Sequence, residues 1–221
     1  MHFFYVVCAL IFNTDDTTDL LPSHASGISA LTRDDYSCKN DVMADGNIFT
    51  YPYYWVGGDE ACAVKILHPI TPTKNYFEHK ILSHGIICAI SIGVVGRDYL
   101  LDRQAGWDNQ GIGYRADDGR LFNENGKGTL FGPKCTAGDR MGCGVIFEGD
   151  DSSNYVKVFF TKNGQQVGGF VKFKRPVSGL YPFMGFNSRG EQFQYLGCWQ
   201  HIPMLPSSQG HDKTNESKLS L

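Results

Sequence analysis

The residues with the most reactive side chains gather in one stretch, residues 99–122, which reads YLLDRQAGWDNQGIGYRADDGRLF. It places Asp102, Arg103 and Asp108 close together, and a pair of adjacent aspartates, Asp117 and Asp118, follows. Carboxylates beside an arginine suggest acid–base catalysis, and the four glycines of the stretch suggest a phosphate-binding loop. The backbone pattern around these residues distinguishes catalysis and phosphate binding from a purely structural role.

The glycines of this stretch do not form a nucleotide-binding loop. Their spacing does not match a dinucleotide fingerprint, and Asp117-Asp118-Gly119 is a turn signal rather than the start of a helix that could hold a phosphate. Aspartate side chains accept backbone hydrogen bonds at turns. We therefore interpret these aspartates as a hairpin turn that joins strands at 111–116 and 120–122, and not as catalytic residues.

The chain between about residues 47 and 200 alternates short apolar stretches with Gly, Asn, Asp and Pro. This spacing is typical of a β-sandwich, and no stretch has a helical hydrophobic period. The clearest hairpin is VKVFFTKNGQQVGGF, in which Asn163-Gly164 supplies the positive φ angles of a tight turn. In its first arm Val156, Val158 and Phe160 share one face, as in a half-buried antiparallel strand. The sequence predicts an all-β sandwich.

Composition argues against several classes of function. The 221 residues carry a net charge of −3 without a basic stripe, so we expect no nucleic-acid partner. The seven cysteines are widely spaced without a Cys-x-x-Cys pair, which argues against a zinc site and a disulfide framework. We expect reduced thiols in the cytoplasm or nucleus, no metal, no cofactor, no membrane partner and a monomer.

An enzyme is also disfavoured, because no nucleophile, base and orienting group occur at a plausible spacing. Ser91 and Ser178 have no visible histidine partner, and Cys143 lies within an apolar strand.

The two ends of the chain differ from the middle. The apolar run from Phe3 to Phe12 is too short to span a bilayer. A signal peptide would require a positively charged start, but no Lys or Arg precedes Arg33. We expect residues 1–46 to be an extension and 47–202 to be the domain. Residues 203–221 are polar and are expected to form a disordered tail.

The order of several motifs resembles the SPRY domain family. The motifs are NYFEHKI, SIGVV, GWDNQGIGYRADDGRLF, GTLFGPKCTAGDRMGCGVIF, VFFTKNGQQVGG and LYPFMGFNSRGEQ, and they match along about 150 residues. The resemblance implies a twisted β-sandwich of two antiparallel sheets without catalytic activity. It also implies that loops at one end capture a short segment of an intracellular partner protein.

The resemblance places the binding residues on three loops expected to meet at one end of the sandwich. The candidates are Tyr54 and Trp55; Tyr99, Asp102, Arg103, Gln104, Trp107 and Asp108; and Ser188 and Arg189. Arginine and tryptophan dominate the energetics of interfaces, and core packing does not explain an arginine at position 103. Trp107 fits equally well as a residue that closes the core, and Tyr54 and Trp55 are similarly ambiguous.

Two alternatives stay open from the sequence. A lectin-like sandwich that binds carbohydrate would also place aromatic and acidic residues in end loops, although no acidic calcium loop is present. A substrate-recognition subunit of a ubiquitin ligase is the other, although no RING or SOCS-box segment is visible. Some SPRY adaptors grip an Asn-rich peptide with a Trp-Gly pair, which residues 187–190 replace with Asn-Ser-Arg-Gly, so that peptide specificity is not expected.

Overall fold

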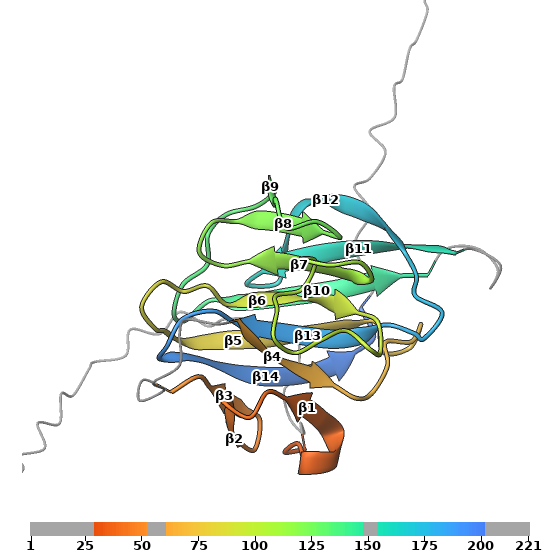
Figure 1. Ribbon diagram of the computed structural model, residues 1–221. Helices are drawn as coiled ribbons and strands as arrows, with labels where there is room; N and C mark the ends of the chain where they lie inside the picture. The colour runs from red at the N-terminus through yellow and green to blue at the C-terminus, as the bar shows by residue number, and fades with distance from the viewer. Residues whose placement is uncertain (1–28, 53–60, 148–153, 202–221) are drawn as a thin grey trace, which may run out of the picture.

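The computed structural model describes residues 29–52, 61–147 and 154–201. They form two antiparallel sheets of seven strands each, packed face to face, with the short 3-10 helix η1 (Arg33–Asp35) before the first strand (Figure 1). The predicted all-β sandwich of two antiparallel sheets is confirmed.

The two sheets are named here A and B. Sheet A has the order β1 (Tyr36–Cys38), β4 (Cys62–Ile66), β13 (Tyr181–Phe186), β6 (Ser91–Val95), β7 (Gly111–Arg115), β8 (Arg120–Asn123), β9 (Thr129–Leu130). Sheet B has the order β12 (Gln165–Lys174), β11 (Tyr155–Lys162), β10 (Arg140–Ile146), β5 (Tyr76–His84), β14 (Glu191–Trp199), β3 (Ile48–Thr50), β2 (Met43–Asp45).

The predicted turns lie where the sequence indicates. Asn163 and Gly164 have φ angles of 53° and 80° and join β11 to β12. Asp118 lies in the turn between β7 and β8, where its Oδ1 accepts a hydrogen bond from the backbone N–H of Arg120 at 3.0 Å. The acidic pair is therefore part of a hairpin turn.

The sandwich begins earlier than residue 47, the start that the sequence suggests for the domain. β1 pairs with β4 in sheet A, and β2 pairs with β3 in sheet B, so residues 36–45 contribute to both sheets. Each of these strands has only three residues, which is too short to show an alternating pattern in the sequence. Residues 1–28 and 202–221 lie outside the described residues.

The loops gather at two ends of the sandwich, which we call distal and proximal. The distal end, on the left in Figure 1, carries loops 85–90, 116–119, 131–139, 163–164 and 187–190. The proximal end carries loops 67–75, 96–110, 124–128 and 175–180.

The described part of the chain enters and leaves at the proximal end. η1 lies there, because the backbone O of Asp35 accepts a hydrogen bond from the N–H of Leu67 at 2.9 Å. After β14, the side chain of Asn75 bonds both backbone groups of His201, at 2.8 Å to the N–H and at 3.0 Å to the O. These bonds fix the entry and exit of the chain.

The 96–110 loop starts at the proximal end but runs back across the outer face of sheet A (Figure 1). Tyr99 and Ala105 pack against Ala63, Val95 and Phe183 in a small apolar cluster on that face. The rings of Tyr99 and Phe183 meet edge to face, with centroids 5.4 Å apart. Sheet A is thus covered on both sides, which explains why β4, β6 and β13 are apolar along nearly their whole length.

Gln104 fixes the part of this loop that extends toward the distal end of the sandwich. Its side chain is fully buried, accepts a hydrogen bond from the Ser91 hydroxyl and donates one to the backbone O of Ala89 at 3.3 Å. Gly185 of the neighbouring strand β13 leaves room for it, since a Cβ there would collide with the Gln104 amide. The loop is therefore held against the distal half of the sheet by a buried polar residue.

Among the described residues, one histidine, His79, lies in the core between the sheets. It is fully buried on β5 and stacks on Phe193 with ring centroids 4.9 Å apart. Neither ring nitrogen has a hydrogen-bond partner among the described residues. Burial lowers the pKa of His79 to about 3, so the imidazole is neutral in the folded protein at neutral pH.

We expect the substitution His79→Phe to remove an acid sensitivity of the fold. The unfolded chain binds a proton at His79 below about pH 6.5 while the folded protein does not, so the histidine lowers the free energy of unfolding as pH falls from 6.5 toward 3. Relative to wild type, the variant should gain about 1.4 kcal/mol per pH unit below 6.5 in urea unfolding experiments. His84→Gln, at an exposed histidine of the same strand, is the control. A parallel pH profile for wild type and His79→Phe would contradict the assignment.

The substitution Gln104→Leu should loosen the 96–110 loop. It keeps the size of the side chain but leaves the Ser91 hydroxyl and the Ala89 carbonyl buried without a partner, which costs about 1–3 kcal/mol of stability. Denaturant unfolding should show this loss, and hydrogen exchange should accelerate at the amides of residues 97–110. The exposed Gln166, substituted as Gln166→Leu, serves as control. Unchanged exchange in the loop would show that Gln104 does not anchor it.

Candidate functional site

Three loops form what we call the three-loop surface: residues 85–90 and residues 187–190 at the distal end, and residues 102–108 of the 96–110 loop, which lie on the outer face of sheet A and reach the distal end at Gln104. The 85–90 loop joins the other two. The N–H of Ile87 donates to the hydroxyl of Ser188 at 3.3 Å, and the carbonyl of Ala89 accepts the bond from Gln104.

Glu191, the first residue of β14, binds the backbone of the 187–190 and 85–90 loops. Its buried carboxyl group accepts hydrogen bonds from the N–H of Asn187 at 2.8 Å, and from the N–H and hydroxyl of Ser188, both at 3.0 Å. The N–H of Ala89 also donates to it. Burial raises the pKa of Glu191 to about 7, and the hydrogen bonds oppose this rise. One carboxyl group thus orders the backbone of two loops.

Arg103 is held by two aspartates on the surface of the third loop. Its Nε donates to Asp102 Oδ1 at 2.9 Å, and its Nη1 donates to Asp108 Oδ2. The Arg103 side chain is 28% exposed, and the aspartate side chains are about half exposed. The bond from Arg103 lowers the pKa of Asp102 below its ordinary value. The aspartates orient the guanidinium and leave it accessible from one side.

The predicted binding residues divide into supporting and accessible groups. Tyr99, Gln104 and Ser188 are buried, so in this structure they position the loops instead of presenting side chains to a partner. The hydroxyl of Tyr99 donates to the O of Gln104 at 2.8 Å and accepts from the N–H of Asp108 at 3.2 Å. The residues that reach the surface are Asp102, Arg103, Trp107, Asp108 and Arg189. Tyr54 and Trp55 lie outside the described residues.

Two residues of this surface escape the sequence analysis. Ile86 and Ile87 are 57% and 53% exposed, although they are large and apolar. Gly85, with a φ of 56°, turns the chain just before them and separates them from β5. An apolar pair directly after a turn glycine is the signal that could have identified them, but in the sequence it is indistinguishable from the start of the next buried strand.

In the described part of the chain, the metal-ligating side chains do not cluster and most of the thiols are buried. No group of three or more metal-ligating side chains occurs there. Burial raises the thiol pKa of Cys62 and Cys88 to about 12 and that of Cys135 and Cys198 to about 11, so these thiols stay protonated and are weak nucleophiles. In the same residues, no helix has the length and apolar character needed to cross a membrane.

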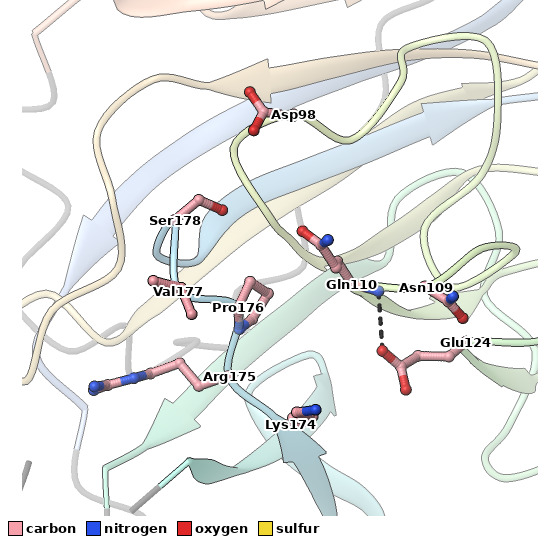
Figure 2. A pocket seen from close by; sticks show the side chains of 9 residues that line it. All are labelled: Asp98, Asn109, Gln110, Glu124, Lys174, Arg175, Pro176, Val177 and Ser178. Carbon is pink, nitrogen blue, oxygen red and sulfur yellow. Dashed lines mark hydrogen bonds between the residues drawn. The ribbon is translucent and has the colours of Figure 1, made fainter. Parts of the chain in front are cut away.

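A hollow of about 580 Å³ lies at the proximal end, between the 96–110 loop and the connection from β12 to β13 (Figure 2). Lys174, the last residue of β12, and Arg175 of the connection lie on one side, whereas Asp98 and Glu124 come from the facing loops. Because the two signs of charge line opposite sides, this hollow favours no ligand of a single charge.

Comparison with known proteins agrees with the fold and the motifs. The model of the SPRY domain matches residues 74–197. SPRY domain-containing protein 3 of Homo sapiens is 40% identical over 151 residues, which cover 68% of this chain and 33% of that protein. The Ran-binding proteins 9/10 homolog of Drosophila melanogaster is 35% identical over 158 residues, which cover 70% of this chain and 16% of that protein. The chain therefore matches about a third or less of the length of these relatives.

Solved structures give the same answer. A crystal structure of a human SPRY domain superposes with a TM-score of 0.64 at 35% identity, covering 72% of this chain and 95% of that one. The SPRY domain of human HERC1 superposes with a TM-score of 0.53 at 20% identity, which supports the fold alone. On the family match, the sandwich topology and these superpositions, this chain belongs to the SPRY domain family.

Proposed function

We propose that this protein is a non-enzymatic interaction module that binds a short extended segment of a partner protein at the three-loop surface. The family is one of protein-interaction domains, which supports the general class. The observation that carries the proposal is the exposure of Ile86 and Ile87 on loops that buried polar groups hold in place.

The exposed isoleucines supply the energy for such binding. Burying an aliphatic side chain of this size removes apolar area worth about 1.5–3 kcal/mol from water. Because Ser188 and Glu191 already fix the backbone of these loops, little ordering is required when a partner binds.

Arg103, on another loop of this surface, supplies directionality. A guanidinium held by Asp102 and Asp108 is preorganised to donate hydrogen bonds to backbone carbonyls or to a carboxylate of the partner. We therefore expect a segment with an apolar residue for the isoleucines and a hydrogen-bond acceptor for Arg103. A monomer acting in the cytoplasm or nucleus is the setting that we propose, since the six described cysteines are all free thiols.

The alternatives have less support. A lectin would use its exposed end-loop groups to bond sugar hydroxyls, whereas the 85–90 loop exposes a pair of isoleucines. A role in substrate recognition for a ubiquitin ligase would require further segments or partner subunits, and it is compatible with the same binding surface.

Peptide selection tests the proposal. The full chain is used to select binders from a displayed library of random peptides, and dissociation constants are measured for the selected sequences by isothermal titration. Arg103→Ala and the double variant Ile86→Ser, Ile87→Ser should each weaken binding about tenfold or more, because they remove central contacts.

Leu130→Ser is the matched control, since Leu130 is 81% exposed on the edge strand β9 and belongs to none of the three loops. Circular dichroism checks that every variant is folded. Selected peptides that bind all folded variants with equal affinity would place the site on another face, and recovery of no binder at micromolar affinity would contradict the proposal.

A further inference from the structure

A second hollow, of about 340 Å³, lies on the outer face of sheet A toward the proximal end. We call it the Lys65 hollow, and the residues that line it are Ser37, Lys65, Leu67, Arg97 and Tyr181. They come from β1, β4, β13, the start of the 67–75 loop and the start of the 96–110 loop, so this hollow shares no lining residue with the three-loop surface.

Lys65 is an unusual residue at this place in the fold. It is the fourth of the five residues of β4, lies directly opposite Ser37 of β1, and only 8% of it is exposed. Its ammonium donates hydrogen bonds to the backbone O of Arg97 and, at 3.3 Å, to that of Tyr99. An ammonium group has three donors, so one remains for a group in the hollow.

The charge of Lys65 is not neutralised by direct contact. Among the described residues, no carboxylate lies within 4 Å of its ammonium. Burial lowers the pKa of Lys65, and the negative charge of the nearby Asp98 opposes this. A buried cation that is bonded only to carbonyl groups gains from an anion placed beside it.

Arg97 adds a second cation to the same hollow. Its Nε donates to the hydroxyl of Tyr181 at 3.1 Å, and its guanidinium carbon lies 5.9 Å from the centre of that ring. These contacts orient the exposed guanidinium, while its terminal nitrogens bond to no described side chain. The hydroxyl groups of Ser37 and Tyr181 complete a polar lining that contains no carboxylate.

We propose that the Lys65 hollow is an anion site that takes a phosphate monoester. Two cations and two hydroxyl groups match the double negative charge and the several acceptor oxygens of a phosphate better than a singly charged carboxylate. The volume admits a phosphate with a few attached atoms, and Leu67, 42% exposed at the rim, offers an apolar contact to what carries it.

The test is a titration of the isotope-labelled full chain, followed by two-dimensional amide NMR. The probes are inorganic phosphate, the tripeptide acetyl-Leu-phosphoserine-Leu-amide, and sodium chloride at equal ionic strength. Phosphate should cause saturable shifts at residues 37, 65, 67 and 97 that chloride does not cause. Tighter binding of the tripeptide than of inorganic phosphate identifies a phosphorylated segment as the source of the anion, and equal binding identifies a small free phosphate compound.

Variants separate this site from general charge attraction. Arg97→Gln should weaken phosphate binding about tenfold, whereas Lys80→Gln, an equal change of charge on the exposed outer face of sheet B, should leave it unchanged. Asp98→Asn removes the repulsive carboxylate near both cations and should strengthen binding several-fold.

Three results would overturn the proposal. They are shifts no larger with phosphate than with chloride, equal weakening by Arg97→Gln and Lys80→Gln, and no gain in affinity with Asp98→Asn. Each leaves the proposed peptide binding at the distal end untouched, because Arg97, Asp98 and Lys80 do not belong to the three-loop surface.

Discussion

Sheet A can bury apolar side chains on both of its faces only because a loop of the same chain covers the outer one. Tyr99 and Ala105 of this loop pack on Phe183 and its neighbours, and this contact dictates the path of the loop across the strands. The first residues of the loop stay over Lys65 at the proximal side, and Gln104 reaches Ala89 at the distal side. Both proposed sites therefore depend on one packing contact.

Two buried ionisable groups organise these sites in similar ways. Glu191 at the distal end accepts hydrogen bonds from backbone N–H groups, and Lys65 donates to backbone carbonyls, so each fixes a loop without a direct ion pair among the described residues. The difference lies in their surroundings. The bonds to Glu191 come from several sides, and its carboxyl group is fully buried. Lys65 borders a hollow and has a donor left over, which is why only Lys65 leads to a ligand proposal.

The sequence carries enough local information to predict the sandwich but not the layout of its surface. Turns such as Asn163-Gly164 can be predicted because only a few residue types tolerate positive φ angles. Strands buried on one face can be predicted because their apolar and polar residues alternate. Short strands such as β1 and β2 cannot be predicted in this way, because three residues are too few to show an alternating pattern.

The candidate site was harder to predict for a different reason. Arg103, Asp102 and Asp108 are recognisable as surface groups from their chemistry, and the structure places them together. Gln104 and Ser188 have polar side chains that suggest a surface too, yet their role follows from long-range contacts with Ala89 and Glu191. Whether a polar residue supports a loop or faces a partner depends on contacts between distant segments, which neighbouring residues in the sequence do not reveal.

The bonds from Asn75 to His201, together with the contact of η1 with Leu67, bring the entry and exit of the domain to the same end. A unit attached in this way can be inserted into a larger polypeptide as a side branch, with both junctions on one side. The 85–90 and 187–190 loops lie at the opposite end from both junctions, so a polypeptide joined at these junctions would leave the two loops uncovered.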